Sequence, residues 1–234
     1  MEKLQEQFYK AFLYKDRWEF YLSGLKITCL LTLGALAIGI VLGILVAVIR
    51  TINDQNQGKK NPLMTVLNGI CKVYTTVIRG TPMMVQLMIF GFVIFASSRK
   101  MMAVSMLALG INSGAYVAEI IRGGIMSIDP GQMEAGRSLG LGYVQVMKSV
   151  IIPQAIKNIL PALGNEMITL FKDTSLDTIL GVKDLTKQAQ SIGAITYDYF
   201  MPLIGAALVY LSIVIILTQL LGILERRLRR SDRI

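Results

Sequence analysis

Four polar side chains recur at helical spacing within an otherwise apolar stretch, residues 101–121. Asn112 and Tyr116 are four residues apart, Tyr116 and Glu119 are three apart, and Ser113 follows Asn112. Spacings of three and four place side chains on one face of a helix. A polar solute with an ammonium and a carboxylate needs acceptors and donors together, and polar groups inside a membrane are candidate functional sites. These four residues are therefore candidates for solute contact, although Asn112 and Ser113 could equally join helix to helix.

Six more polar residues share this placement inside long apolar runs. They are Arg79, Thr81, Gln86, Asn165, Glu166 and Thr169. Purely structural roles are also open to them. Arg79 and Glu119 could form ion pairs, and Glu166 could neutralise Lys157 or Lys172. The sequence marks out candidates for a solute path and leaves open which of them a solute touches.

The overall composition requires a membrane around these polar groups. Of 234 residues, 53% are hydrophobic and 17% are charged, and the mean hydropathy is +0.56. A soluble domain has about a quarter charged residues, so this chain has too few charges to cover a surface in water. We therefore expect an all-α integral membrane protein. Its net charge of +9 is better explained by basic cytoplasmic loops than by nucleic-acid binding.

Several kinds of chemistry are excluded by what the sequence lacks. There is no histidine, which excludes a histidine-based triad and a histidine zinc site. Two cysteines, Cys29 and Cys71, are too few for a disulfide framework or a cysteine metal cluster. No P-loop motif occurs, so this chain does not hold ATP in that way. We expect no catalytic residue, metal or cofactor in the chain itself.

Five apolar runs are long enough to cross a bilayer, which requires about 20 helical residues. They cover about residues 25–49, 63–98, 101–121, 149–171 and 201–224. The second run is too long for one straight helix, and we expect a kink at Gly80 and Pro82, where a split would instead give six spans. The fourth run contains Lys157, Glu166 and two prolines, so it must be shielded by protein or line a wet path.

The remaining segments define the domain limits and the orientation. Residues 1–21 mix charges with aromatic side chains and predict an amphipathic interfacial segment, with Trp18 and Tyr21 as interface anchors. Residues 22–226 form the transmembrane domain, and residues 227–234 a basic cytoplasmic tail. Five arginines after the last span favour a cytoplasmic C-terminus. With five spans, the N-terminus of this multi-pass cell-membrane protein is then outside.

The loop at residues 122–148 contains signals for a short helix, a turn and a second helix. Asp129 can cap a helix that begins at Pro130. Gly140 permits a sharp turn before helical periodicity resumes at Tyr143. A short amphipathic helix beside a membrane either lies at the interface or docks in a groove on a partner. The pattern alone does not separate these two roles.

Several motifs of the chain resemble those of one transporter family. Residues 134–153 have the spacing of the EAA loop of ATP-binding cassette importer permeases: E-A-A, three residues, G, nine residues, I-x-L-P. Here the motif reads Glu134-Ala135-Gly136, Gly140 and Val150-x-Ile152-Pro153. The runs at residues 79–87 and 116–125 resemble segments of the polar amino acid permeases of the histidine, glutamine, glutamate and arginine type. The resemblance extends over about residues 23–224.

This resemblance implies a fold, a set of partners and a coupling site. The implied fold is a type I importer transmembrane domain with a cytoplasmic coupling helix. The implied partners are a second permease subunit (in a homodimer or heterodimer), an ATPase dimer that holds ATP and Mg, and an extracytoplasmic amino acid-binding protein. The residues implied in coupling are Asp129, Pro130, Glu134, Ala135, Gly136, Arg137, Gly140 and Pro153. Residues 182–200 could touch the binding protein or simply connect two spans.

Two other functions remain open at this stage. An ion-gradient-driven secondary amino acid transporter or a channel subunit would use Glu119 and Glu166 as ion sites. Such a protein has no need for the helix-turn-helix loop, and secondary transporters often contain internal repeats, which this sequence does not show. A membrane enzyme would need a catalytic constellation, which the sequence lacks.

Overall fold

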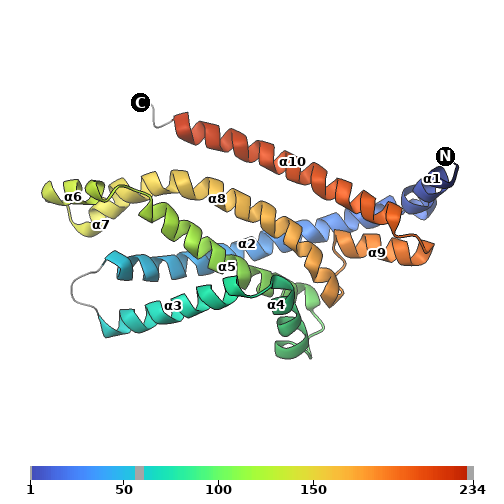
Figure 1. The fold of residues 1–234 in the computed structure, drawn as a ribbon, viewed down its shortest axis with the longest axis horizontal. Coiled ribbons are helices and arrows are strands. Elements are labelled where there is room, and N and C mark those ends of the chain that lie inside the picture. The colour runs from blue at the N-terminus through green and yellow to red at the C-terminus, as the bar shows by residue number, and fades with distance from the viewer. Residues whose placement is uncertain (1, 56–60, 231–234) are drawn as a thin grey trace. The chain divides into compact units, whose positions relative to one another are not determined.

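Every regular element of the described chain is a helix, so the expectation of an all-α protein is confirmed (Figure 1). The computed structural model describes residues 2–55 and 61–230. The elements in chain order are α1 (Glu2–Phe8), the π-helical turn η1 (Tyr9–Leu13), the 3-10 turn η2 (Tyr14–Asp16), α2 (Trp18–Gln55), α3 (Pro62–Gly80), α4 (Met83–Ile89), the π-helical turn η3 (Phe90–Ile94), α5 (Met101–Met126), α6 (Pro130–Ser138), α7 (Tyr143–Val146), the π-helical turn η4 (Met147–Ile151), α8 (Ile152–Asp173), the 3-10 segment η5 (Thr174–Leu180), α9 (Leu185–Thr196) and α10 (Phe200–Arg230).

The helices gather into two compact units, and the long helices contribute to both. Among the described residues, the first unit contains 2–36, 82–110 and 167–219. The second unit contains 37–55, 61–81, 111–166 and 220–230.

Three helices of the described chain are long and apolar enough to cross a membrane. They are α2, α5 and α10, and α3 with α4 and η3 would count as a fourth if that broken pair crosses as one span. The fourth predicted run, now α8, is not among them, because it carries Lys157, Glu166 and two prolines. The prediction of five spans therefore stays a prediction, as does the cytoplasmic tail, of which residues 231–234 lie outside the described residues.

The second apolar run is interrupted at residues 80–82, as expected from its glycine and proline. Helix α3 ends at Gly80, and both Thr81 (φ −118°, ψ 147°) and Pro82 (φ −64°, ψ 135°) have extended backbones. A proline pushes the residue before it out of the helical region, which explains Thr81. The Thr81 hydroxyl donates to the Val77 carbonyl at 2.8 Å and so caps the end of α3. The feature is a complete break of the helix, at the residues expected to interrupt it.

The N-terminal segment differs from the predicted interfacial helix. Lys15 (φ 53°) and Asp16 (φ 54°) are both left-handed, and they separate α1 and η1 from α2. Tyr21, predicted as an interface anchor, is only 6% exposed and its ring stacks on Phe12 at 5.3 Å between centroids. The prediction for Tyr21 is therefore wrong, because its ring is buried by tertiary packing within the first unit. Trp18 is 45% exposed, which leaves its anchoring role a prediction.

Glycines bring α2 close to α5 in the second unit. A Cβ atom on Gly43 would lie 2.4 Å from Val117 Cγ1, and one on Gly39 would lie 3.0 Å from Ser113 Cβ. Real Cβ atoms essentially never approach within 3.0 Å, so the contact at Gly43 requires glycine. Such small residues allow close helix packing in membranes, and here the packing fixes the position of Ser113.

Candidate functional site

The predicted short helix of the loop forms as its sequence signals indicate. Asp129 is the N-cap of α6, its Oδ1 accepts from the Gly131 N–H at 2.8 Å, and Pro130 is the first helical residue. Proline has no N–H to lose at this position and its φ suits the first turn. Glu134, Ala135 and Arg137 are exposed on the finished helix. The loop therefore presents a short, well-capped helix with acidic and basic side chains toward its surroundings.

The turn after α6 depends on Gly140. Its φ is +85°, a left-handed conformation that favours glycine. The Gly140 N–H donates to the Arg137 carbonyl at 3.0 Å, and the Leu141 N–H donates to the Gly136 carbonyl at 3.2 Å. This pair of hydrogen bonds is the Schellman pattern, which satisfies the last carbonyls of a helix. The turn thus fixes where α6 ends and how α7 leaves it.

Close packing explains why glycine, and not the alanine of the EAA pattern, occupies position 136. Gly136 is the buried residue of α6, and a Cβ there would lie 2.7 Å and 2.9 Å from the two γ-methyl groups of Val146. Val146 is itself fully buried. The two arms of the loop therefore pack against each other through the missing side chain of Gly136.

We expect Gly136→Ala to loosen this packing. Overpacking a tight contact costs about 1–3 kcal/mol, which outweighs the helix-propensity gain of about 1 kcal/mol. Hydrogen exchange of the amides of residues 131–141, measured in the purified permease complex, should become several-fold faster. Adding Val146→Ala should slow it again, because the second change makes room for the new methyl group. Unchanged exchange in the single variant would contradict this packing argument.

A groove of about 460 Å³ lies beside α6 in the second unit. Its wall contains Asp54 at the end of α2, Met126 at the end of α5, and Glu134, Arg137 and Tyr143 from the loop. Burial raises the pKa of the Tyr143 phenol. The loop is thus a surface with an exposed helix and an adjacent hollow, which suits contact with another protein.

Glu119 is held between two arginines rather than facing an open space. Arg50 pairs with Glu119 Oε1, and Arg122 reaches Oε2 with Nε at 3.2 Å and Nη2 at 3.1 Å. Arg122 also lies 3.5 Å from Asp54, and Arg50 donates to Thr75 Oγ1 at 3.3 Å. The side chains of Arg50 and Glu119 are only 12% and 19% exposed. Of the two roles considered for Glu119, the structure therefore shows the ion pair. The hydrogen-bonded network around it connects α2, α3 and α5.

Two pairs of candidate solute-path residues meet within the second unit. The Ser113 hydroxyl donates to Glu166 Oε1 at 2.8 Å, and the Arg79 guanidinium lies 5.3 Å from the centre of the Tyr116 ring. Asn112 is buried beside this group and Asn165 is exposed on α8. In the first unit, Gln86 is buried in α4 and Thr169 is exposed on α8.

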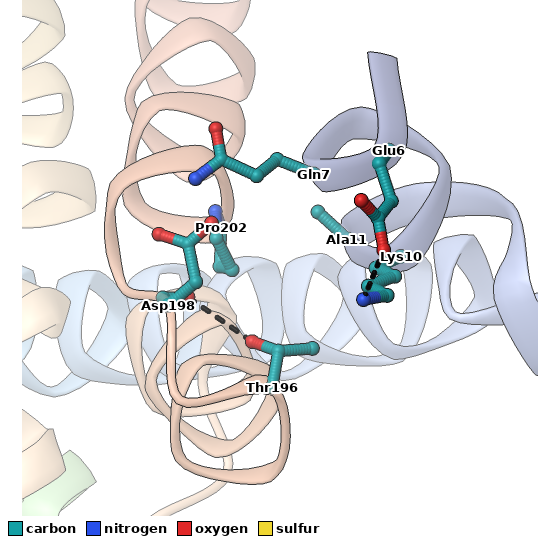
Figure 2. Close-up of a pocket in the computed structure, with 7 residues that line it drawn as sticks. All are labelled: Glu6, Gln7, Lys10, Ala11, Thr196, Asp198 and Pro202. Carbon is teal, nitrogen blue, oxygen red and sulfur yellow. Dashed lines mark hydrogen bonds and ion pairs between the residues drawn. The ribbon is translucent and has the colours of Figure 1, made fainter. Parts of the chain in front are cut away.

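A second hollow lies in the first unit, between the N-terminal elements and the α9–α10 connection (Figure 2). It has a volume of about 200 Å³, and most of the residues that line it have polar side chains. Glu6 and Lys10 form an exposed ion pair at 2.6 Å on one side, and Thr196 donates to the Asp198 carbonyl at 3.1 Å on the other. Tyr197 beside it is 95% exposed. This hollow includes part of the predicted segment 182–200 and part of the N-terminal segment.

Sequence reasoning did not single out Arg50, Asp54 or Val146 as partners in the site. Arg50 is visible in the sequence only as the charge that ends an apolar run, and its partner Glu119 is 69 positions away. No local spacing connects these residues. A charged pair at the ends of two apolar runs is the signal that could have suggested the contact.

The sequence matches known transport proteins over most of its length. The sequence pattern of the family described as "Binding-protein-dependent transport system inner membrane component" matches residues 39–230. The chain is 39% identical to the arginine transport system permease protein ArtQ of Bacillus subtilis, over 91% of this chain and 94% of the relative. It is 36% identical to the glutamine transport system permease protein GlnP of Escherichia coli (strain K12), over 89% and 92%.

A solved structure of a transporter also matches this chain. A crystal structure of an amino acid ABC transporter with histidines matches 89% of this chain and 94% of its own, with a TM-score of 0.81 and 42% identity. The matched region of the family includes the EAA-like loop and most of the apolar helices. The chain therefore belongs to the family of binding-protein-dependent transport system inner membrane components, as a multi-pass membrane permease subunit of an ABC importer.

Proposed function

We propose that this permease translocates a polar amino acid and is driven through residues 129–153 by separate ATPase subunits. The observation that carries the coupling role is α6, a capped helix with Glu134, Ala135 and Arg137 exposed and its end fixed by the turn at Gly140. A rigid exposed helix can transmit a partner's movement, whereas a flexible loop would absorb it. Relatives named for arginine and glutamine transport support a polar amino acid as the solute.

The proposed assembly follows from this role. ATP and Mg bind to an ATPase dimer that grips α6, and a second permease subunit completes the pathway. The ATPase can bias the permease only by binding one arrangement of the helices more tightly than the other. The loop and the C-terminus are then cytoplasmic and the N-terminus is outside. In that orientation, the polar hollow at Lys10 and Asp198 is suited to contact with an amino acid-binding protein.

The proposed solute path contains complementary polar groups. Glu166 with Ser113 provides acceptors for an ammonium, and Arg79 provides donors for a carboxylate. Asn112, Asn165, Thr81 and Tyr116 add further polar groups in the second unit. Gln86 and Thr169 are separate candidates within the first unit. Glu119 is the weakest candidate, because Arg50 and Arg122 already occupy its carboxylate.

Reconstitution tests the proposal directly. The permease, its ATPase and its binding protein would be incorporated into proteoliposomes, with radiolabelled arginine, glutamine or histidine outside. We expect uptake only when ATP is available on the side of α6 and the loaded binding protein is on the other side. A hydrolysis-deficient ATPase is the matched control. Uptake by the permease alone under an imposed proton or sodium gradient would overturn the proposal and favour a secondary transporter.

A further inference from the structure

Asp177 is an ionisable residue without any apparent use in transport and with an unusual environment. It lies in η5 of the first unit and is 0% exposed. Neither of its carboxyl oxygens has a hydrogen-bond partner in the part of the chain that the structure describes. Ser105 Oγ, a neighbour of this carboxyl on α5, is also fully buried without a hydrogen bond there. The Asp177 carboxyl and the Ser105 hydroxyl are therefore buried together, and apart from each other they have no hydrogen-bond partner in the described part of the chain.

Apolar packing surrounds this pair. Leu180 of η5 belongs to a buried cluster with Leu87 of α4 and Val104 of α5, and Leu176 and Ile179 pack against the same cluster. An ionised carboxylate in such surroundings, without a partner, is strongly unfavourable. A neutral carboxylic acid is much less costly to bury, and it can donate its own proton to the Ser105 hydroxyl.

Among the described residues, no positively charged side chain acts on Asp177. The charges that act on it are those of Asp184 and Asp173, both of which are carboxylates. Helix α4 and η3, which pack against η5, contain no ionisable residue, and α9, which also packs against η5, contributes Lys187. The acidic neighbour Asp184 is itself satisfied, because it caps α9 by accepting from the Lys187 N–H at 2.9 Å and the Thr186 N–H at 3.1 Å. Burial, together with these like charges, raises the pKa of Asp177 to about 8.

We propose that Asp177 is a proton-binding site, which keeps its proton at neutral pH and releases it in alkaline medium, loosening the packing of η5 against α4 and α5. This proposal goes beyond the transport function and does not depend on it. In the proposed orientation η5 belongs to an outside segment, so the relevant pH is that of the external medium.

The sign of the pH effect follows from the two states. An aspartate in an unfolded chain has a pKa of about 3.9, whereas Asp177 in the folded protein has a pKa of about 8. Between these values the folded state binds the additional proton, so stability falls as the pH rises. The contribution of this proton is fully present below about pH 4 and is lost as the pH passes through about 8.

The first experiment compares thermal unfolding of the purified permease–ATPase complex in nanodiscs between pH 5 and pH 9.5. Asp177→Asn should remove part of the pH dependence, so that the variant unfolds several degrees above the unmodified complex at pH 9 and much closer to it at pH 5. Asp16→Asn removes the same charge from an exposed position of the same unit and is the matched control. Parallel pH curves for the unmodified complex and Asp177→Asn would overturn the proposal.

A second measurement covers the case in which the asparagine variant does not fold. Infrared spectra of the unmodified complex with isotope-labelled aspartate should contain the C=O stretch of a protonated carboxylic acid at pH 7. We expect this band to disappear as the pH passes through about 8. Absence of the band at pH 7 would overturn the proposal, and so would its replacement by a sodium- or potassium-dependent spectrum, which would indicate a cation at Asp177 instead.

Discussion

Replacing Gly140 by valine, or Glu134 by lysine, is expected to abolish ATP-driven uptake while the membrane helices remain folded. A β-branched residue at the φ of +85° found at Gly140 is strained by about 1–2 kcal/mol, and the hydrogen-bonded turn at the end of α6 would open. Glu134→Lys keeps the turn but reverses a charge on the exposed face of the helix. Stimulation of the ATPase by loaded binding protein should fall at least tenfold, a coupling loss of about 1.4 kcal/mol.

Gly142→Val is the matched control for this prediction. Gly142 has a φ of −67°, and a Cβ there would meet nothing within 4 Å, so valine is tolerated by the backbone and by the neighbours. We expect this variant to retain coupling. Glu134→Gln, which removes the charge without reversing it, should give an intermediate result. Normal stimulation in both Gly140→Val and Glu134→Lys would show that α6 does not transmit the movement.

Glu119→Gln is expected to produce the largest loss of stability among single substitutions in the second unit. The change leaves Arg50 and Arg122 close together without the carboxylate that neutralises them. Leaving a partly buried charge without its partner costs about 1–3 kcal/mol, which for a chain of this size lowers the Tm by several degrees. Thermal unfolding of the purified complex measures this effect.

Two comparisons make the ion-pair prediction specific. Glu6→Gln breaks the exposed pair with Lys10 and should leave the Tm unchanged, because water already solvates both groups. The double variant Arg50→Met with Glu119→Met should recover part of the lost stability, since it removes charges together. An unchanged Tm for Glu119→Gln, combined with a raised KM for the amino acid, would instead return Glu119 to the solute path.

Local chemistry explains which parts of the site could be predicted from the sequence. Asp129, Pro130 and Gly140 act on backbone groups within a few residues of themselves, so their spacing alone specifies the cap, the start and the end of α6. The break at Pro82 is equally local, since proline restricts the residue before it. These signals need no knowledge of the rest of the fold.

Features that depend on distant parts of the chain could not be predicted in this way. Tyr21 is placed by Phe12 and by the Pro202 carbonyl, which its hydroxyl reaches at 3.4 Å. The contact of Gly136 with Val146 and the pairing of Arg50 with Glu119 likewise follow from tertiary packing. An aromatic residue near an apolar run has the same sequence pattern whether it anchors at a lipid surface or packs inside a unit, so only the structure distinguishes the two.

The break between α3 and α4 has a consequence for hydration. Gly80, Thr81 and Pro82 are all exposed, and the regular ladder of backbone hydrogen bonds ends there. Hydrocarbon cannot satisfy free backbone amides and carbonyls. Non-helical backbone is tolerated at membrane depth only where protein or water covers it, so this exposed break requires such cover wherever it enters a bilayer.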